Sequence, residues 1–236
     1  MNTVQSPRSL IEAAVWMNDM SQRIHHVNGR HYVAGNSGTA YELSVRNLTP
    51  NRIEVVNTVD GRNTLKDEPG SPTNRGMVVP GYGLWTIKGY RLSDATIRKF
   101  LFGTPTGSIA EQATGSVANV GIIGFAVYRE KHYDDGLVTA VAPPAIYRGV
   151  RGVASASLST EQSSLGTHMG EQVYDPVTRT SFDREGDPDV LVIEYDTYEH
   201  LRDRGIIQPD YETSTTAPRP NPFPGSTTGY EHYRVG

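Results

Sequence analysis

The chain has 236 residues, a formal net charge of −4 and no cysteine. The lack of cysteine excludes a disulfide framework, a zinc–thiolate site and a cysteine nucleophile. The 22 Lys and Arg residues form no basic block beside 26 Asp and Glu residues, so we expect no nucleic-acid partner. No stretch is apolar enough to span a bilayer and no signal-peptide pattern is present, so we expect cytosolic synthesis and no membrane partner.

The first predicted element is a helix over residues 7–24. Ser6 is suited to cap it, Pro7 suits its first turn, and Leu10, Ala13 and Met17 belong to an apolar stripe at helical spacing. The sequence therefore predicts an N-terminal helical arm that comprises residues 1–28.

From His31 onward the apolar period changes to two, as in residues 40–47, where Tyr41, Leu43 and Val45 alternate with polar residues. Asp60-Gly61 is the strongest hairpin signal of the chain. Further strands are expected at residues 52–59, 77–79, 83–90, 98–102, 119–130, 177–182 and 189–195. With 24 Gly and 15 Pro between them, these strands predict a mainly β body over residues 29–207, a β-sandwich of jelly-roll or immunoglobulin-like type.

Three segments complete the predicted plan. Residues 119–130 are the most apolar and are expected at the centre of a sheet. Residues 136–166, broken by Pro143-Pro144, are expected to form a long loop, and residues 197–204 a short helix that ends at Gly205. Residues 208–236 are rich in Pro, Thr, Ser and Gly and predict an extended C-terminal arm, because they offer too little apolar surface for a core.

The polar clusters do not indicate a metal or cofactor site. His25, His26 and His31 are interpreted as flanking a surface turn at Asn28-Gly29. The acidic run of residues 183–189 has oxygen ligands at alternate positions, but Pro188 stands where a calcium loop needs glycine, so a solvated turn is favoured. We therefore expect no catalytic residue, no cofactor and no metal.

Aromatic residues give the best functional signal. The C-terminal arm has no core in which to bury them, and spaced aromatics on an extended Pro-rich segment suit docking into grooves of a partner. The expected partner-binding residues are Tyr211, Phe223, Tyr230 and Tyr233, together with Trp16 of the predicted helix.

The middle of the chain resembles a group of uncharacterised β-rich proteins of bacteria and tailed phages. The resemblance rests on the segments RHYVA (30–34), YELSVRN (41–47), VDGRN (59–63), GYR (89–91) and ANVGIIGFAVYRE (118–130), with a weaker one through GTHMG (166–170) and IEYDTYEHL (193–201). It covers about residues 29–207. The resemblance implies a compact β-rich module and no catalytic residues, since the group has no assigned activity.

The leading hypothesis is a non-enzymatic structural protein of a tailed-phage virion, a capsid decoration or minor capsid or tail subunit. Its partners would be other virion subunits in a homo-oligomer or lattice, and its location the virion. One alternative is a carbohydrate- or surface-binding module that uses Tyr82 and Tyr90. The other is an enzyme that pairs His132 with Asp134 or Asp135 in a pocket shared with His168.

Overall fold

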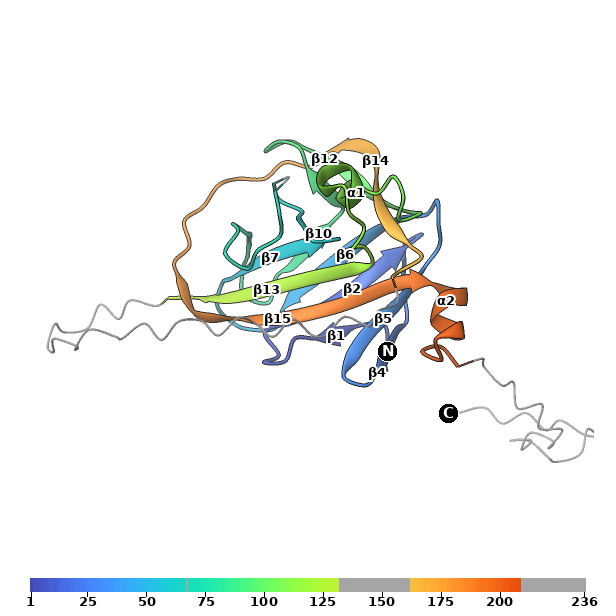
Figure 1. Ribbon diagram of the computed structural model, residues 1–236. Helices are drawn as coiled ribbons and strands as arrows, with labels where there is room; N and C mark the ends of the chain where they lie inside the picture. The colour runs from blue at the N-terminus through green and yellow to red at the C-terminus, as the bar shows by residue number, and fades with distance from the viewer. Residues whose placement is uncertain (67, 132–161, 209–236) are drawn as a thin grey trace, which may run out of the picture.

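The computed structural model describes residues 1–66, 68–131 and 162–208 (Figure 1). The predicted mainly β fold is confirmed, since the described residues form an eight-stranded and a seven-stranded sheet with two short helices. The eight-stranded sheet consists of β1 (Val4–Gln5), β2 (Ile11–Met17), β3 (Met20–Ser21), β6 (Ala40–Asn47), β10 (Leu84–Ile87), β11 (Gly89–Arg91), β12 (Thr96–Gly103) and β14 (Gly166–Tyr174). The seven-stranded sheet consists of β4 (Ile24–Val27), β5 (Arg30–Gly35), β7 (Ile53–Val59), β8 (Arg62–Asn63), β9 (Met77–Val79), β13 (Ile122–Glu130) and β15 (Arg184–Thr197).

Strands β13 and β15 lie inside the seven-stranded sheet, and β6 lies inside the eight-stranded sheet. In the seven-stranded sheet the order is β4-β5-β15-β13-β7-β8, so β13 lies between β15 and β7, as its apolar sequence predicted. In the eight-stranded sheet β6 pairs with β2, β10 and β12. All of these pairings are antiparallel except that of β5 with β15. This parallel pair places β5 beside β15, the last strand of the described residues.

The predicted N-terminal helix is wrong, because residues 1–28 form strands of both sheets. Ile11, Val15 and Met17 are buried on one face of β2, while Trp16 is exposed on the other. Apolar residues of this segment fit a helical stripe, but apolar side chains at every second position, from Ile11 to Met17, also fit a strand, and pairing with β6 decides between them. The turn at Asn18-Asp19, with both φ values positive, returns the chain into β3 and leaves no room for a helix.

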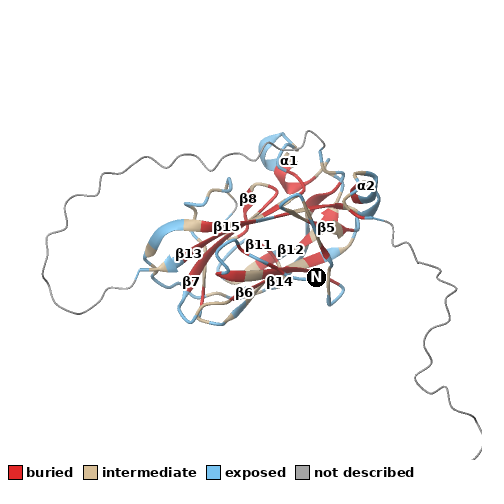
Figure 2. Cartoon of the chain, turned by 90° about the horizontal axis from the view of Figure 1, so that it is seen from below, coloured by how far each residue is buried: buried red, intermediate tan, exposed pale blue. Residues whose placement is uncertain are grey.

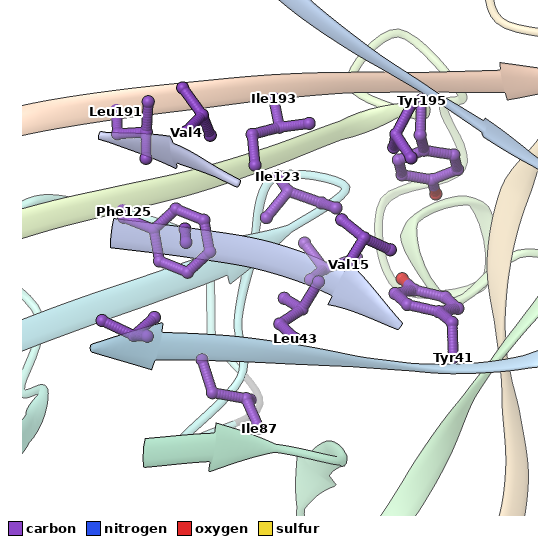
Figure 3. Close-up of a cluster of buried hydrophobic side chains, with 14 of the residues drawn as sticks. Val4, Val15, Tyr41, Leu43, Ile87, Ile123, Phe125, Leu191, Ile193 and Tyr195 are labelled. Carbon is purple, nitrogen blue, oxygen red and sulfur yellow. The ribbon is translucent and has the colours of Figure 1, made fainter. Parts of the chain in front are cut away.

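The two sheets face each other across one shared hydrophobic core. Figure 3 shows Leu43 of the eight-stranded sheet pointing toward Ile123 and Ile193 of the seven-stranded sheet, and all three are fully buried. Along the strands of both sheets the inner residues are buried, whereas turns and helix surfaces are exposed (Figure 2). Side chains that alternate between core and surface therefore leave the two outer faces available for other contacts.

Short helices close the ends of the body. Helix α1 (Ile109–Thr114) was not predicted; it begins at Ser108, whose hydroxyl accepts from the Glu111 amide, and lies in a segment read as a loop. Helix α2 (Tyr198–Asp203) is confirmed, with Thr197 as its N-cap and Gly205 at a φ of 71° after its end. The strand expected at residues 177–182 is absent and β14 takes its place earlier in the chain. Most of the predicted loop 136–166, and the arm beyond Gln208, lie outside the described residues.

Candidate functional site

Helix α2 creates a pocket by packing on the outer face of the seven-stranded sheet. A small cluster of buried side chains, Tyr32, Leu201 and Ile207, joins β5 to the helix and to the residues after it. Ile193 and Tyr195 of β15 face the core, so Glu194 and Asp196 face outward beside the helix. The end of β15 thus presents two carboxylates on a surface that α2 partly covers.

The pocket has a volume of about 380 Å³, a floor and two facing walls. The outer face of β15 forms its floor and α2 one wall, while the segment 116–122 forms the opposite wall. Its lining includes Tyr32, Val117, Asn119, Val120, Gln162, Glu194, Asp196, Leu201 and Arg204. This volume lies in the range of small-molecule sites, which is about 300–1,000 Å³.

Asp196 is almost fully buried and its carboxylate is occupied by internal partners. One oxygen accepts from the amides of Ser164 (2.9 Å) and Thr197 (2.8 Å) and from the Ser164 hydroxyl. The other oxygen is 2.6 Å from Nδ1 of His200 and 3.7 Å from the Arg204 guanidinium. These bonds fix the start of α2 against the segment that leads into β14, which is a structural role.

Serine, histidine and aspartate therefore meet here without the geometry of a hydrolase triad. In a triad the imidazole lies between the hydroxyl and the carboxylate and takes the proton of the hydroxyl. Here Ser164 bonds to Asp196 directly, on the oxygen opposite the one that His200 contacts. The described residues of this cluster thus provide no nucleophile paired with a base.

Glu194 is the charged group at the pocket floor. Burial raises the pKa of its carboxyl, and the nearby Arg30 and Arg204 guanidinium groups oppose that shift. Arg30 is 3.4 Å away, which is long for a charge-assisted hydrogen bond. Arg204 lies over the Tyr32 ring, 5.6 Å from its centroid, so its position is fixed by aromatic contact as well as by Asp196.

A second buried carboxylate, Asp60, holds the pocket wall from behind. Its Oδ1 accepts from the Gly121 amide (2.9 Å) and the Tyr195 hydroxyl (2.6 Å), and its Oδ2 accepts from the Thr167 amide (2.8 Å). Thr167 also hydrogen-bonds to the hydroxyls of Tyr195 and Tyr41, each at 2.7 Å. Burial raises the pKa of Asp60, while the hydrogen bonds that its carboxylate accepts lower it. Asp60 thus joins the wall segment at Gly121 to β14 and β15.

One of the predicted partner-binding residues, Trp16, lies among the described residues, on the sheet opposite the pocket. Trp16 lies on the outer face of the eight-stranded sheet, is 36% exposed and donates from Nε1 to the Ser44 hydroxyl at 2.8 Å. Tyr211, Phe223, Tyr230 and Tyr233 lie outside the described residues. Trp16 is therefore the one predicted contact residue that lies among the described residues.

The aromatic platform expected for a carbohydrate-binding module is only half present. Tyr82 is 64% exposed, but Tyr90 is buried, stacks edge-on against Phe100 and donates its hydroxyl to the Val59 carbonyl. Tyr90 is buried because its alternation in β11 directs it into the core, and its hydroxyl is satisfied there. That part of the expectation is wrong.

Of the four residues in the enzyme alternative, one, His168, lies among the described residues. His132, Asp134 and Asp135 lie outside the described residues. His168 lies in β14, with Nε2 2.8 Å from the Thr104 carbonyl. No evidence for the enzyme reading follows from His168 alone.

The histidine turn and the acidic run occupy ordinary structural positions. Asn28-Gly29 forms the predicted turn between β4 and β5, and the Nδ1 atoms of His26 and His31 are 3.0 Å apart. In the acidic run, Asp189 accepts from the Arg8 backbone amide through both oxygens. In the part of the chain that the structure describes, no three His, Asp or Glu side chains are arranged to hold a metal ion, and neither helix is of a length and apolarity that would cross a membrane.

Sequence reasoning did not find the pocket, because its parts are far apart in the chain. Glu194 and Arg204 were read only as members of a strand and a helix, and Asp60 as a turn residue. The available signal was Glu194, a charged residue that follows Val190 and Val192 on the same face of a central strand. In comparisons with known proteins, no family model, no curated protein and no solved structure matches the chain.

Proposed function

We propose that the chain is a non-enzymatic structural subunit of a tailed-phage virion, a capsid decoration or minor structural protein. Its body would be a β-sandwich of jelly-roll or immunoglobulin-like type, and its C-terminal arm would clasp neighbouring subunits. The virion setting is supported by the resemblance of residues 29–207 to β-rich proteins of bacteria and tailed phages. Since residues 1–28 belong to the sheets, the proposal includes one arm, the C-terminal one.

The observation that carries the proposal is the point at which the chain leaves the body. Ile207 is buried in the cluster under α2, and the next residue, Gln208, is exposed. The 29 residues of the segment 208–236 contain Pro, Thr, Ser and Gly in excess and four spaced aromatic residues. A segment of this composition that starts at the surface suits docking on a neighbour, and many weak arms in a lattice bind strongly together.

Trp16 supports the same proposal on the body. Its indole lies on the outer face of the eight-stranded sheet and is 36% exposed. Large aromatic side chains at a surface are the residue type most enriched at the centres of protein interfaces. We therefore assign Trp16 a contact with a neighbouring subunit.

The test is the composition of particles produced by the genome that encodes the chain. Mass spectrometry of purified virions should find the full-length chain in stoichiometric amount. A chain ending at Ile207, and a full-length variant with Tyr211, Phe223, Tyr230 and Tyr233 changed to Ser, should both be lost from the particles. Absence of the unaltered chain from purified virions would overturn the structural role, and retention of both variants would overturn the role of the arm.

The alternative function, a carbohydrate-binding module, lost one of its two platform residues when Tyr90 proved to be buried. A different feature supports it. The pocket under α2 is lined by polar and apolar side chains together.

A further inference from the structure

The pocket between β15, α2 and the segment 116–122 lies on a different sheet from Trp16, the described residue assigned to assembly. Trp16 lies on the other sheet, and its indole faces away from the core that the two sheets share. The pocket is built from secondary structure on two sides and is fixed from behind by Asp60 through Gly121. A site whose walls are held by buried hydrogen bonds is preorganised for a ligand.

Charges of both signs lie at the pocket. The lining includes the Glu194 and Asp196 carboxylates and the Arg204 guanidinium, and the Arg30 guanidinium lies 3.4 Å from Glu194. An anionic ligand would approach Arg204 but also Glu194, and a cationic ligand would meet the reverse. Because each ionic ligand meets a like charge at short range, this mixture of charges favours a neutral ligand.

The lining nevertheless offers strong hydrogen-bonding groups. The carboxylate of Asp196 is occupied by Ser164, Thr197 and His200, whereas Glu194 makes a long contact of 3.4 Å to Arg30 and interacts electrostatically with Arg204. Carboxylate, guanidinium and amide groups at the pocket belong to Glu194, Arg204, Asn119 and Gln162. These groups accept from and donate to hydroxyl groups, so a ligand with several hydroxyls would satisfy them.

Apolar surface lies beside these polar groups. Val117, Val120 and Leu201 line the pocket, and the Tyr32 ring lies under Arg204. A ligand that fits must therefore present C–H groups on one side and hydroxyls on another. Pyranose rings combine these two properties, whereas small ions and purely apolar molecules do not.

We propose that this pocket binds a neutral, polyhydroxylated ring, either a free monosaccharide or the terminal sugar of a glycan, with Glu194 accepting from its hydroxyls. Arg204 would donate to the same ring, and Val117 would contact its C–H face. The proposal depends on the pocket alone, so it stands or falls separately from the virion role.

Saturation-transfer NMR on the full-length protein would test the assignment. The probes are neutral monosaccharides (glucose, galactose, mannose, rhamnose and N-acetylglucosamine) and their methyl glycosides, with acetate and methylammonium as charged controls. At least one sugar should receive saturation from the wild-type protein, while the charged controls should not. Binding of the free sugar but not the glycoside would indicate a free monosaccharide, and binding of both a terminal sugar.

Variants locate the binding. Glu194→Ala should weaken sugar affinity about tenfold or more, because a charged hydrogen-bond acceptor is lost. Glu42→Ala removes the same charge from β6 in the other sheet and should leave affinity unchanged, as should Trp16→Ala. If circular dichroism shows that Glu194→Ala does not fold, Gln162→Ala replaces it, with a smaller loss of affinity expected.

Three results would overturn the proposal. They are no transfer to any sugar of the panel, affinity that is the same in the wild-type protein and in the folded pocket variant, and preferential binding of acetate or methylammonium. Loss of sugar binding in Trp16→Ala with full binding in Glu194→Ala would place the site on the outer sheet face and would equally contradict the pocket assignment.

Discussion

Asp60 occupies the first position of the turn between β7 and β8, and its carboxylate is buried beneath the pocket wall. Its φ of 50° and that of Gly61, 72°, belong to the left-handed region that this hairpin turn requires. Its carboxylate accepts hydrogen bonds from three backbone amides, those of Gly121, Ile122 and Thr167, and from the Tyr195 hydroxyl. The residue therefore combines a local turn preference with a long-range polar network, and only the first was evident from the sequence.

Asp60→Asn separates these two roles. Asparagine adopts the same left-handed turn, so the hairpin is kept, but its amide nitrogen would face a backbone N–H where a carboxylate oxygen now accepts. We expect a loss of about 1–3 kcal/mol in the free energy of unfolding, the usual cost of an unsatisfied buried polar group. Urea unfolding at neutral pH measures it.

Tyr41→Phe provides the comparison for this prediction. It removes only the hydroxyl that bonds to Thr167 at the edge of the same network, so its loss should be the smaller of the two. Stability of Asp60→Asn equal to that of the wild-type protein would show that the turn, and not the network, is the role of Asp60.

At the scale of an element, the β4–β5 hairpin contains a pH-sensitive pair. The rings of His26 and His31 face each other across the hairpin, with centroids 4.7 Å apart. Burial, and then the neighbouring His26, lower the pKa of His31 below its ordinary value. The unfolded chain therefore binds a proton more readily than the folded hairpin, so stability is present above about pH 6.5 and is lost as the pH falls below it.

His31→Asn should remove this dependence. The thermal midpoint of the wild-type protein should fall between about pH 7.5 and about pH 5.5 by more than that of His31→Asn. His26→Asn removes only the charge of the neighbour, so it should remove only part of the difference. Differential scanning calorimetry at the two pH values measures both, and equal slopes in all three proteins would contradict the role assigned to His31.

Elements were predictable from the sequence where local pattern and tertiary pairing agree. Residues 40–47 alternate strictly and form β6 with those bounds, and Thr197 and Gly205 bound α2 as expected. Residues 11–17 satisfy both a helical and a two-residue period, so their state is decided by β6, which lies far along the chain. The sequence of β14, rich in small and polar residues, carries too weak a period to mark an edge strand.

The pocket was less predictable than the elements that form it. Glu194 and Arg204 meet Tyr32 only because β15 pairs with β5 in parallel and α2 folds back over both. The opposite wall, at residues 116–122, is brought there by β13, which follows it and pairs with β15. Local pattern contains no information on such pairings, so a site made by topology is found only once the sheet order is known.

For the whole molecule, the N-terminal segment is a structural part of both layers. Its first three strands belong to the eight-stranded sheet, and β4 starts the seven-stranded sheet, so the chain crosses between the layers before residue 28 (Figure 1). The segment also contributes these residues to the shared core: Val4, Leu10, Ile11, Ala13, Val15, Met17 and Ile24. A helical arm outside the β body, as predicted from the sequence, would contribute none of them.

Deletion of residues 1–28 should therefore abolish folding. Truncating a single large core side chain costs about 2–5 kcal/mol, and a domain of this kind has only about 5–15 kcal/mol in total, so losing seven core residues exceeds the available stability. The deletion variant should show no cooperative thermal transition by circular dichroism. The matched truncation after Ile207, which removes a similar length from the other end, should unfold cooperatively near the wild-type midpoint, because the core clusters of the described residues end at Ile207. A cooperative transition in the variant lacking residues 1–28 would mean that β6 and β5 hold their sheets without these strands, and would restore the N-terminal segment as a candidate for a separable arm.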